Sequence, residues 1–501
     1  MYCIELDFVN EVYLRIKCQS DAFTFISNHF KYFVENYKYS PKYKMKMWDG
    51  RVSLIDYKQK LLPIGILPFL IKLCKEYHHT IKYNFNIDLL KGSHSKEYID
   101  NFIEKVNKVY KPKYNLLDFQ LESIQKSIMY LRGISNLPTG SGKSLSIYYL
   151  VLFFRYIKAD TLIVVPKIGL VEQLYNNFEE YGWYDVDKYV SKVYDGSKPD
   201  FSKPIILSTF QSLERKPKEF FSRFKSIIID EAHQTKCTTI MNICKKCTNA
   251  SYRLGYTGSI NKEPINYMTL FSYLGPVIVR RRTKDLIDMD IVSNIKIRNV
   301  IVRYPEAFIK LNKNRSYAQE IKEIISYTDR NKVIKRIIDS KKDGENVLIL
   351  CHFLEHFKIL QKFLEDNYKD THNIKYIKGD IKGDVREDIR VSMNSEPNTI
   401  LLGSVGTCST GISINAIHHI ILASSSKAEI SIKQSIGRGL RKFEGKSEVV
   451  WWDIVDNLCW KNSKGDIYEN YVFKHWQERL KCYEKESFEY TTKEISIDSK
   501  D

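Results

Sequence analysis

The chain carries Pro138-Thr139-Gly140-Ser141-Gly142-Lys143-Ser144 between an apolar segment and a segment with helical spacing. Glycines lack a Cβ, so the backbone can wrap closely around a phosphate, and the N–H groups that open the following helix attract the anion. Lys143 can reach the β- and γ-phosphate oxygens of ATP, and Ser144 can bind Mg²⁺. We therefore expect these seven residues to bind ATP and its metal ion.

An acidic pair supports this reading. The apolar run 224–229 ends in Asp230-Glu231-Ala232-His233, and residues at the carboxyl end of a parallel strand face the ligand crevice. Asp230 is expected to hold Mg²⁺ through water, and Glu231 to polarise the attacking water. A solvated acidic turn is the alternative, but the phosphate loop 87 residues upstream (230 − 143) favours a catalytic pair.

The order of these motifs and several others resembles the superfamily 2 helicases and translocases. Leu137 stands where the general phosphate-loop pattern has glycine, which fits the Pro-Thr-Gly variant of that group. The resemblance implies that Gln120, with Phe119 beside it, reads adenine. It also implies nucleic-acid contacts at Pro166, Lys167, Thr209, Gln211 and Thr410. Coupling roles are implied for His233, Thr257, Ser259 and Gly411.

The segment Gln434-Ser435-Ile436-Gly437-Arg438-Gly439-Leu440-Arg441 completes the set. An arginine supplied from a second domain stabilises the charge that develops on the γ-phosphoryl group during hydrolysis. By the group's pattern Arg441 is the finger, with Gln434 and Arg438 assisting. Both arginines are expected on one face of a helix, and a surface role for either is the alternative. Ser413 stands where the group often has aspartate, which puts that contact in doubt.

Longer segments resemble the UvsW-type family of phage recombination helicases almost end to end. The resemblance covers 41–57 with its Trp48-Asp49-Gly50-Arg51 core, Tyr304-Pro305-Glu306, Thr328-Asp329-Arg330-Asn331 and 409–413. It implies an ATP-driven motor that unwinds or branch-migrates DNA junctions, D-loops and R-loops. The usage of Lys, Asn, Ile and Tyr points to a virus, so we expect the protein in the cytoplasm of a host cell.

Short apolar runs alternate with helical stretches from about residue 116, which predicts parallel sheets with crossover helices. Together with the resemblance, this gives an α/β fold with two tandem RecA-like domains behind a small N-terminal α+β module. A linker is expected at 107–115, a long helix over 467–490, and a frayed end at 495–501. The expected division is 1–110, 116–285, a connecting segment 286–334, 335–460, and a C-terminal helix and tail 461–501.

The charge balance favours a polyanionic partner. The chain has 78 Lys and Arg against 60 Asp and Glu, a formal charge of +18. No apolar run reaches the roughly 18 residues that span a bilayer, and the first residues do not read as a signal peptide. We therefore expect nucleic acid and no membrane, although surplus lysine can also serve solubility alone.

Basic residues and aromatics alternate within 31–60, where cations can neutralise phosphates and rings can stack on unpaired bases. The residues expected to contact nucleic acid are Lys42, Lys44, Lys46, Trp48 and Arg51. A solvated basic loop whose aromatics form a small core is the alternative. A second candidate patch is Arg280-Arg281-Arg282.

Cys244 and Cys247 form a CxxC with Cys237 nearby, but no fourth ligand lies at zinc spacing. Ile240, Ile243 and the two cysteines fall at helical spacing, which favours a buried helix face. Three other functions remain open. The motor motifs do not separate DNA from RNA, so an RNA helicase or remodeller is possible; a decayed motor that only binds, or the motor part of a restriction or repair nuclease, is less favoured.

Overall fold

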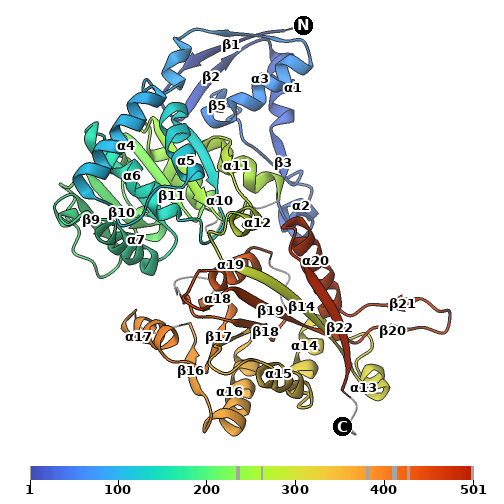
Figure 1. Cartoon of the computed structure of the whole chain (residues 1–501). Helices are drawn as coiled ribbons and strands as arrows, with labels where there is room; N and C mark the ends of the chain where they lie inside the picture. Colours follow the sequence, from blue (N-terminus) through green and yellow to red (C-terminus); the bar gives the residue numbers. More distant parts are fainter. Residues whose placement is uncertain are drawn as a thin grey trace. The chain divides into compact units, whose positions relative to one another are not determined.

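The computed structural model of the chain describes residues 2–232, 237–260, 263–379, 383–408, 414–425 and 429–497. These residues form two compact units (Figure 1). The first unit holds the described residues up to Leu137 together with Gly142–Arg281, and the second holds Pro138–Ser141 and the described residues from Arg282 onward. In the described part of the chain, each unit contains one sheet of seven parallel strands.

A small mixed sheet with the order β5-β2-β1-β6 begins the first unit. Its strands are β1 (Cys3–Phe8), β2 (Tyr13–Lys17), β5 (Leu61–Pro63) and β6 (Thr80–Tyr83). Helices α1 (Ser20–His29) and α3 (Leu67–Glu76) pack on it, because their apolar faces share a core with the inward residues of β1 and β2. A separate ribbon of β3 (Lys31–Phe33) and β4 (Arg51–Ser53) carries the short helix α2 (Pro41–Lys44).

The first seven-stranded sheet has the order β13-β7-β12-β11-β8-β10-β9. Its strands are β7 (Arg132–Asn136), β8 (Thr161–Val165), β9 (Val190–Val193), β10 (Ile205–Thr209), β11 (Ser226–Asp230), β12 (Tyr252–Thr257) and β13 (Val277–Arg280). The central strands are continuous apolar runs buried on both sides, as parallel strands covered by helices require.

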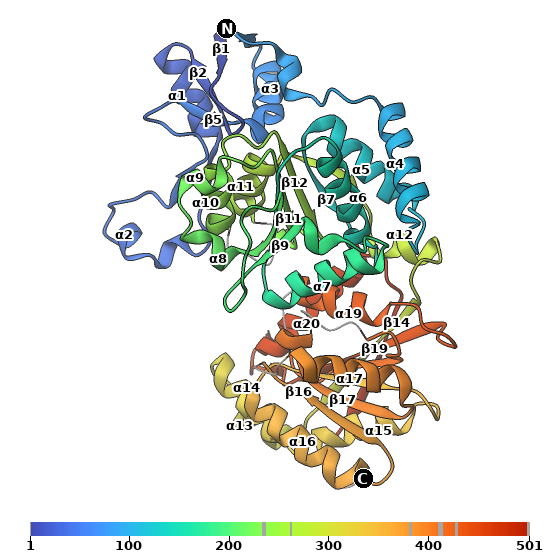
Figure 2. The same cartoon turned by 90° about the vertical axis from the view of Figure 1, so that its left-hand side faces the viewer.

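Helices cover both faces of this sheet. On one side lie α5 (Asp118–Tyr130), α6 (Lys143–Tyr156) and α7 (Ile168–Glu180); on the other lie α10 (Cys237–Lys246) and α11 (Pro264–Leu274) (Figure 2). The shorter helices are α8 (Phe210–Glu214) and α9 (Lys218–Phe221). As the sequence predicted, the inner face of α10 and the residue just after the helix are buried in the core. The residues concerned are Ile240, Ile243, Cys244 and Cys247.

Helix α4 (Lys96–Tyr110) differs from the expected linker, which was placed at 107–115. It packs against α5 and α6, and Phe102 meets Phe153 edge-on with ring centroids 5.3 Å apart. The helix forms because one of its faces is apolar and buried. The residues of that face are Ile99, Phe102, Ile103 and Val106. The final turn of α4 therefore occupies the start of the segment expected to be a linker.

The N-terminal module and the first large sheet share packed surfaces. The ring of Phe69 stacks on that of Phe271 in α11, and Gly65 approaches so closely that a Cβ there would lie 2.0 Å from the Phe271 carbonyl oxygen. Glu11 forms an ion pair of 2.8 Å with Arg132 at the start of β7. The module is thus held to the amino edge of the sheet, and the two belong to one unit.

The second unit is built on a sheet with the order β16-β17-β15-β18-β19-β14-β22. Its strands are β14 (Asn294–Arg303), β15 (Val347–Cys351), β16 (Asn373–Ile377), β17 (Thr399–Ser404), β18 (His419–Leu422), β19 (Glu448–Asn457) and β22 (Tyr490–Ser496). The helices of this unit are α12 (Thr283–Asp288), α13 (Glu306–Leu311), α14 (Tyr317–Ser326), α15 (Arg330–Asp339), α16 (Leu354–Tyr368), α17 (Gly383–Ser395), α18 (Val405–Cys408), α19 (Glu429–Gly439) and α20 (Tyr471–Lys485).

The fold class is confirmed, but the second sheet extends beyond the expected range 335–460 on both sides. Strand β14 comes from the segment expected to be a connector, and β22 (Tyr490–Ser496) from the expected C-terminal helix and tail 461–501, with its last two residues in the end expected to be frayed. The expected helix over 467–490 is α20 alone, preceded by the hairpin of β20 (Trp460–Lys461) and β21 (Ile467–Tyr468). Strand β22 is an edge strand whose exposed Thr, Lys and Glu side chains hide the usual alternation.

Among the described residues, none of the helices combines the length and the apolar character that crossing a bilayer demands.

Candidate nucleotide site and nucleic-acid contacts

The carboxyl ends of five neighbouring strands in the first sheet carry the predicted motifs. The phosphate loop follows β7, Thr257 and Ser259 end β12 and its loop, and Asp230 ends β11. Pro166 and Lys167 follow β8, and Thr209 ends β10. Because these strands are parallel and adjacent, residues that lie up to 121 positions apart in the sequence (259 − 138) meet at one edge of the sheet.

The phosphate loop has the backbone that its glycines permit. Gly140 and Gly142 have φ angles of +87° and +71°, in the left-handed region that a Cβ disfavours. A Cβ on Gly142 would also lie 2.4 Å from Nε2 of Gln120. Helix α6 begins at Lys143, so the open N–H groups of its first turn follow the loop directly. This arrangement can bind the phosphates of a nucleotide.

Lys143 links the loop to the acidic pair. Its Nζ lies 3.4 Å from Oε1 of Glu231 and donates to the Leu137 carbonyl oxygen at 3.3 Å. Both side chains are largely buried, at 10% and 16% exposure, so their attraction is weakly screened by water. Glu231 has a φ of +49°, a strained conformation for a residue with a side chain. Such strain is characteristic of residues held in place for function.

Asp230 sits in an environment that lacks enough positive charge. Burial and the negative charge of Glu231 raise the pKa of Asp230 to about 7, while Lys143 and the Glu231 backbone N–H act in the opposite direction. That N–H donates to Oδ1 of Asp230 at 2.9 Å. A divalent cation would supply the missing charge, and carboxylate and hydroxyl oxygens are the ligands that Mg²⁺ prefers. The chemistry of Asp230 and Ser144 therefore fits Mg²⁺.

Gln120 ties the start of α5 to the phosphate loop. Its Oε1 accepts from the backbone N–H of Leu117 at 2.9 Å, and its Nε2 donates to the Gly142 carbonyl oxygen at 3.4 Å. The neighbouring Phe119 is buried, with the Arg281 guanidinium 5.9 Å from its ring centroid. A ligand bound at the loop would therefore contact a glutamine that is already fixed in place.

Tyr181 is a site residue that the sequence analysis missed. It lies at the end of α7, and its hydroxyl is 2.7 Å from Oγ of Ser144. The Tyr181 ring meets those of Tyr114 and Tyr148 edge-on, which fixes its position. No motif or spacing singled it out, because a tyrosine 37 residues from the loop looks like any core aromatic of this tyrosine-rich chain.

The nucleic-acid candidates of the first unit differ in exposure. Lys167 and Gln211 are exposed, whereas Pro166, Thr209 and Thr257 are buried. Thr209 caps α8 by accepting from the Ser212 N–H, and Thr257 donates to the Ser259 carbonyl oxygen at 2.7 Å. Their hydroxyls thus help to shape the loops at the strand ends.

The arginine segment lies in the second unit. Gln434 and Arg438 are one turn apart on α19, and Gln434 is 8% exposed. The expectation that both arginines lie on one helix is wrong for Arg441, because α19 ends at Gly439 and Arg441 lies two residues beyond it. Three further predicted residues, His233, Thr410 and Gly411, lie outside the described residues.

The basic cluster of the N-terminal module contains side chains that serve the local fold and side chains that are exposed. Nε1 of Trp48 donates to the Arg51 carbonyl oxygen at 2.7 Å, and the Arg51 guanidinium lies 4.4 Å from the Phe33 ring centroid. These two residues therefore hold the local fold together. Three lysines of the cluster, Lys42, Lys44 and Lys46, are exposed and can reach phosphates.

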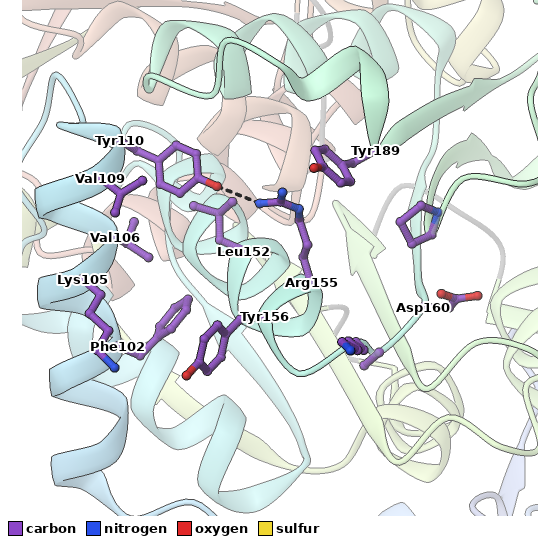
Figure 3. Close-up of a pocket in the computed structure, with 13 residues that line it drawn as sticks. Phe102, Lys105, Val106, Val109, Tyr110, Leu152, Arg155, Tyr156, Asp160 and Tyr189 are labelled. Carbon is purple, nitrogen blue, oxygen red and sulfur yellow. Dashed lines mark hydrogen bonds between the residues drawn. The ribbon is translucent and has the colours of Figure 1, made fainter.

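A separate pocket of about 670 Å³ lies between α4 and the end of α6 (Figure 3). Apolar side chains of Phe102, Val106 and Leu152 line it, and Arg155 donates to the Tyr110 hydroxyl at 2.7 Å. The loop before β8 and Pro204 before β10 also contribute, which places the pocket at the amino edge of the sheet. None of the predicted site residues lines it.

Comparisons with known proteins match three segments to family models. Residues 3–88 match DNA helicase UvsW, N-terminal; residues 92–262 match Type III restriction enzyme, res subunit; residues 329–442 match Helicase conserved C-terminal domain. The boundary between the first two matches, at 88–92, agrees with the packing of α4 against α5 and α6, two helices that cover the first large sheet.

Full-length similarity was also found. The chain is 28% identical to the ATP-dependent DNA helicase uvsW of Enterobacteria phage T4, over 99% of this chain and 100% of that protein. The crystal structure of T4 UvsW matches over 99% of both chains with 26% identity and a TM-score of 0.51. The ATP-dependent Type ISP restriction-modification enzyme LlaBIII, at 15% identity and a TM-score of 0.56 over 78% of this chain and 32% of that one, shares the fold.

Proposed function

This chain belongs to the UvsW-type superfamily 2 helicases and is an ATP-dependent DNA helicase, and we propose that its substrates are branched DNA intermediates. Junctions, D-loops and R-loops are the intermediates in question, opened by unwinding or by branch migration. The observation that carries the nucleotide part is the meeting of Lys143, Glu231 and Asp230 at one sheet edge.

Each group at that edge has a role in the proposed reaction. The loop N–H groups and Lys143 bind the phosphates. Ser144 and Asp230 would hold Mg²⁺, which would supply positive charge beside the phosphates. Glu231 orients and polarises the attacking water, and Nζ of Lys143 lies 3.4 Å from its Oε1. Gln120, whose Nε2 donates to the Gly142 carbonyl oxygen, recognises adenine.

Arginines of the second unit complete the reaction in this proposal. Arg441 supplies positive charge to the γ-phosphoryl group during turnover, and Gln434 and Arg438 assist it. Because these groups come from a different unit than Lys143, hydrolysis and movement of the units would be linked. Thr209, Pro166, Lys167 and Gln211 of the first unit and Thr410 of the second would grip the strand that is moved.

Branched substrates are supported by the N-terminal module. Its exposed lysines can bind phosphates without reading sequence, and the module belongs to the same unit as Lys143, Asp230 and Glu231. A second DNA-contacting surface on the motor unit would favour substrates with two duplex arms or a duplex next to a single strand.

The test is an unwinding assay that compares a fork, a four-way junction, a D-loop, an R-loop and a plain duplex of equal length. The proposal predicts that branched substrates are unwound at least about tenfold faster than the plain duplex. A preference for plain duplex would refute the branched-substrate proposal. Stronger stimulation of ATP hydrolysis by single-stranded RNA than by junction DNA would favour the RNA alternative.

A further inference from the structure

Residues 37–48 form a compact tip on the β3–β4 ribbon, and its surface is unusual. The tip holds four lysines and no acidic residue. Three large apolar side chains on it are strongly exposed: Tyr39 at 77%, Met45 at 68% and Met47 at 74%. Lysine and methionine alternate directly over Lys44-Met45-Lys46-Met47. Among the described residues, Met289 is the third strongly exposed methionine, and its exposure of 54% is lower than that of Met45 and Met47.

The tip is a fixed structure rather than a loose loop. The Tyr37 ring stacks on Phe33 at 4.6 Å and meets Tyr43 edge-on at 4.9 Å, which gives the tip a small aromatic core of its own. Backbone N–H groups of Met45 and Met47 donate to the carbonyl oxygens of Pro41 and Lys42, both at 2.9 Å. The two methionines are therefore held outward while aromatic rings are used for packing.

The tip lies on a projecting part of the first unit. Figure 2 shows α2 on a lobe that extends away from both sheets of the first unit. Gly50, with a φ of +82°, lets the chain return beneath Tyr37, because a Cβ there would lie 2.3 Å from that ring. The lobe thus presents both exposed apolar side chains and exposed lysines.

We propose that Met45 and Met47 form a wedge that enters the base stack at the branch point of DNA. Proteins that kink or part a duplex insert apolar side chains such as methionine between base steps. The flanking Lys44 and Lys46, with Lys38 and Lys42, would bind the phosphates on either side of the opened step. A lysine next to each methionine matches the phosphates that flank a base step, whereas an apolar contact with another protein does not require these lysines.

The inference rests on the proposed function, because a wedge acts only if the motor moves DNA. It predicts which step fails without it. Binding of single strands and the ATP hydrolysis that they stimulate do not require base pairs to be parted. Parting of the first base pair at the branch does, so only that step should depend on the two methionines.

The experiment uses the full chain with Met45→Ser and Met47→Ser together. Met289→Ser is the matched control, since it makes the same change at an exposed methionine of the second unit. A second variant, Met45→Leu with Met47→Leu, keeps the apolar character. A fork carries the fluorescent base 2-aminopurine in its first pair, and its fluorescence is read on binding without ATP.

The wedge predicts that fluorescence rises with the parent, the control and the leucine variant, and stays flat with the double serine variant. Fork unwinding by the double serine variant should fall at least about fivefold, with single-strand-stimulated ATP hydrolysis within about twofold of the parent. Unwinding and fluorescence equal to those of Met289→Ser would overturn the wedge, as would an equal loss of the ATP hydrolysis stimulated by single strands. Absence of DNA-stimulated hydrolysis in the parent would instead refute the proposed function.

Discussion

Nζ of Lys143 and Oε1 of Glu231 lie 3.4 Å apart although the two residues come from different strand ends of the first sheet. The contact joins the group that binds phosphate to the group that activates water. Glu231→Gln keeps the shape of the side chain but removes the charge and the base. We expect ATP turnover to fall at least about 100-fold, as for loss of a general base, with nucleotide binding retained.

Turnover and binding of a fluorescent ATP analogue, measured on the same preparation, separate these effects. Glu172→Gln is a suitable control, because Glu172 is half-exposed and pairs with Lys192 away from the loop. Full activity of Glu231→Gln would remove Glu231 from the reaction.

Gln120 makes two hydrogen bonds that a single variant removes. Gln120→Ala removes the cap on the Leu117 N–H and the bond to the Gly142 carbonyl oxygen. We expect the KM for ATP to rise about tenfold, equivalent to ~1.4 kcal/mol, and preference for ATP over GTP to shrink. Gln319→Ala is the matched control, because Gln319 caps α14 in the same way in the second unit. It should lower the Tm by a similar amount and leave the KM unchanged.

Asp230 is expected to cost stability when no metal is bound. Its pKa of about 7 exceeds the unfolded value of about 3.9, so the folded state holds a proton that the unfolded chain has lost. Stability from this group therefore falls as pH rises from about 4 to about 7. In EDTA at pH 8, Asp230→Asn should raise the Tm by ~2–4 °C while abolishing ATP turnover.

The gain should shrink at pH 5.5, where the parent carboxyl is protonated. Asp195→Asn, an exposed position in the same unit, should change the Tm little at either pH. A lower Tm for Asp230→Asn at pH 8 would show that the carboxylate stabilises the fold.

Arg330 explains two segments that the sequence analysis could only match by resemblance. It is 1% exposed and forms bonds of 2.6 and 3.0 Å to Asp456, which also accepts from the Tyr304 hydroxyl at 2.8 Å. Arg330→Ala would leave Asp456 buried without its cation. We expect the free energy of unfolding to fall by about 3–5 kcal/mol. Denaturant unfolding, monitored by limited proteolysis of the second unit, measures this loss.

Arg315→Ala supplies the comparison, since Arg315 pairs with Glu323 at a half-exposed site. Its loss should cost less than about 1 kcal/mol. Equal stability of the two variants would contradict the structural role assigned to Arg330.

Sequence patterns predicted the first sheet, and the motifs that they singled out lie together at its carboxyl edge, because phosphate binding demands particular residues at fixed places. Gly140, Lys143 and Asp230 have no substitutes in that chemistry, and short apolar runs mark the strands that carry them. Tyr181 was not predicted, because tertiary packing brings its hydroxyl to Ser144 and no sequence motif has a tyrosine at that spacing.

The second sheet was harder to delimit. Strand β22 is exposed and polar, and only its pairing with β14 makes it a strand. The helix expected through 467–490 ends at Lys485, where Ser487 with a φ of +58° turns the chain toward β22. Such tertiary pairing is absent from local patterns of hydrophobicity.

The most direct test of the central claim is ATP hydrolysis stimulated by a DNA fork, measured for the parent and for Lys143→Ala. Lys158→Ala, an exposed lysine of the same unit, is the control. The account predicts strong stimulation in the parent and the control, and hydrolysis below about 1% of the parent in Lys143→Ala, a loss of ~2.7 kcal/mol or more. Unaltered turnover in Lys143→Ala would contradict it.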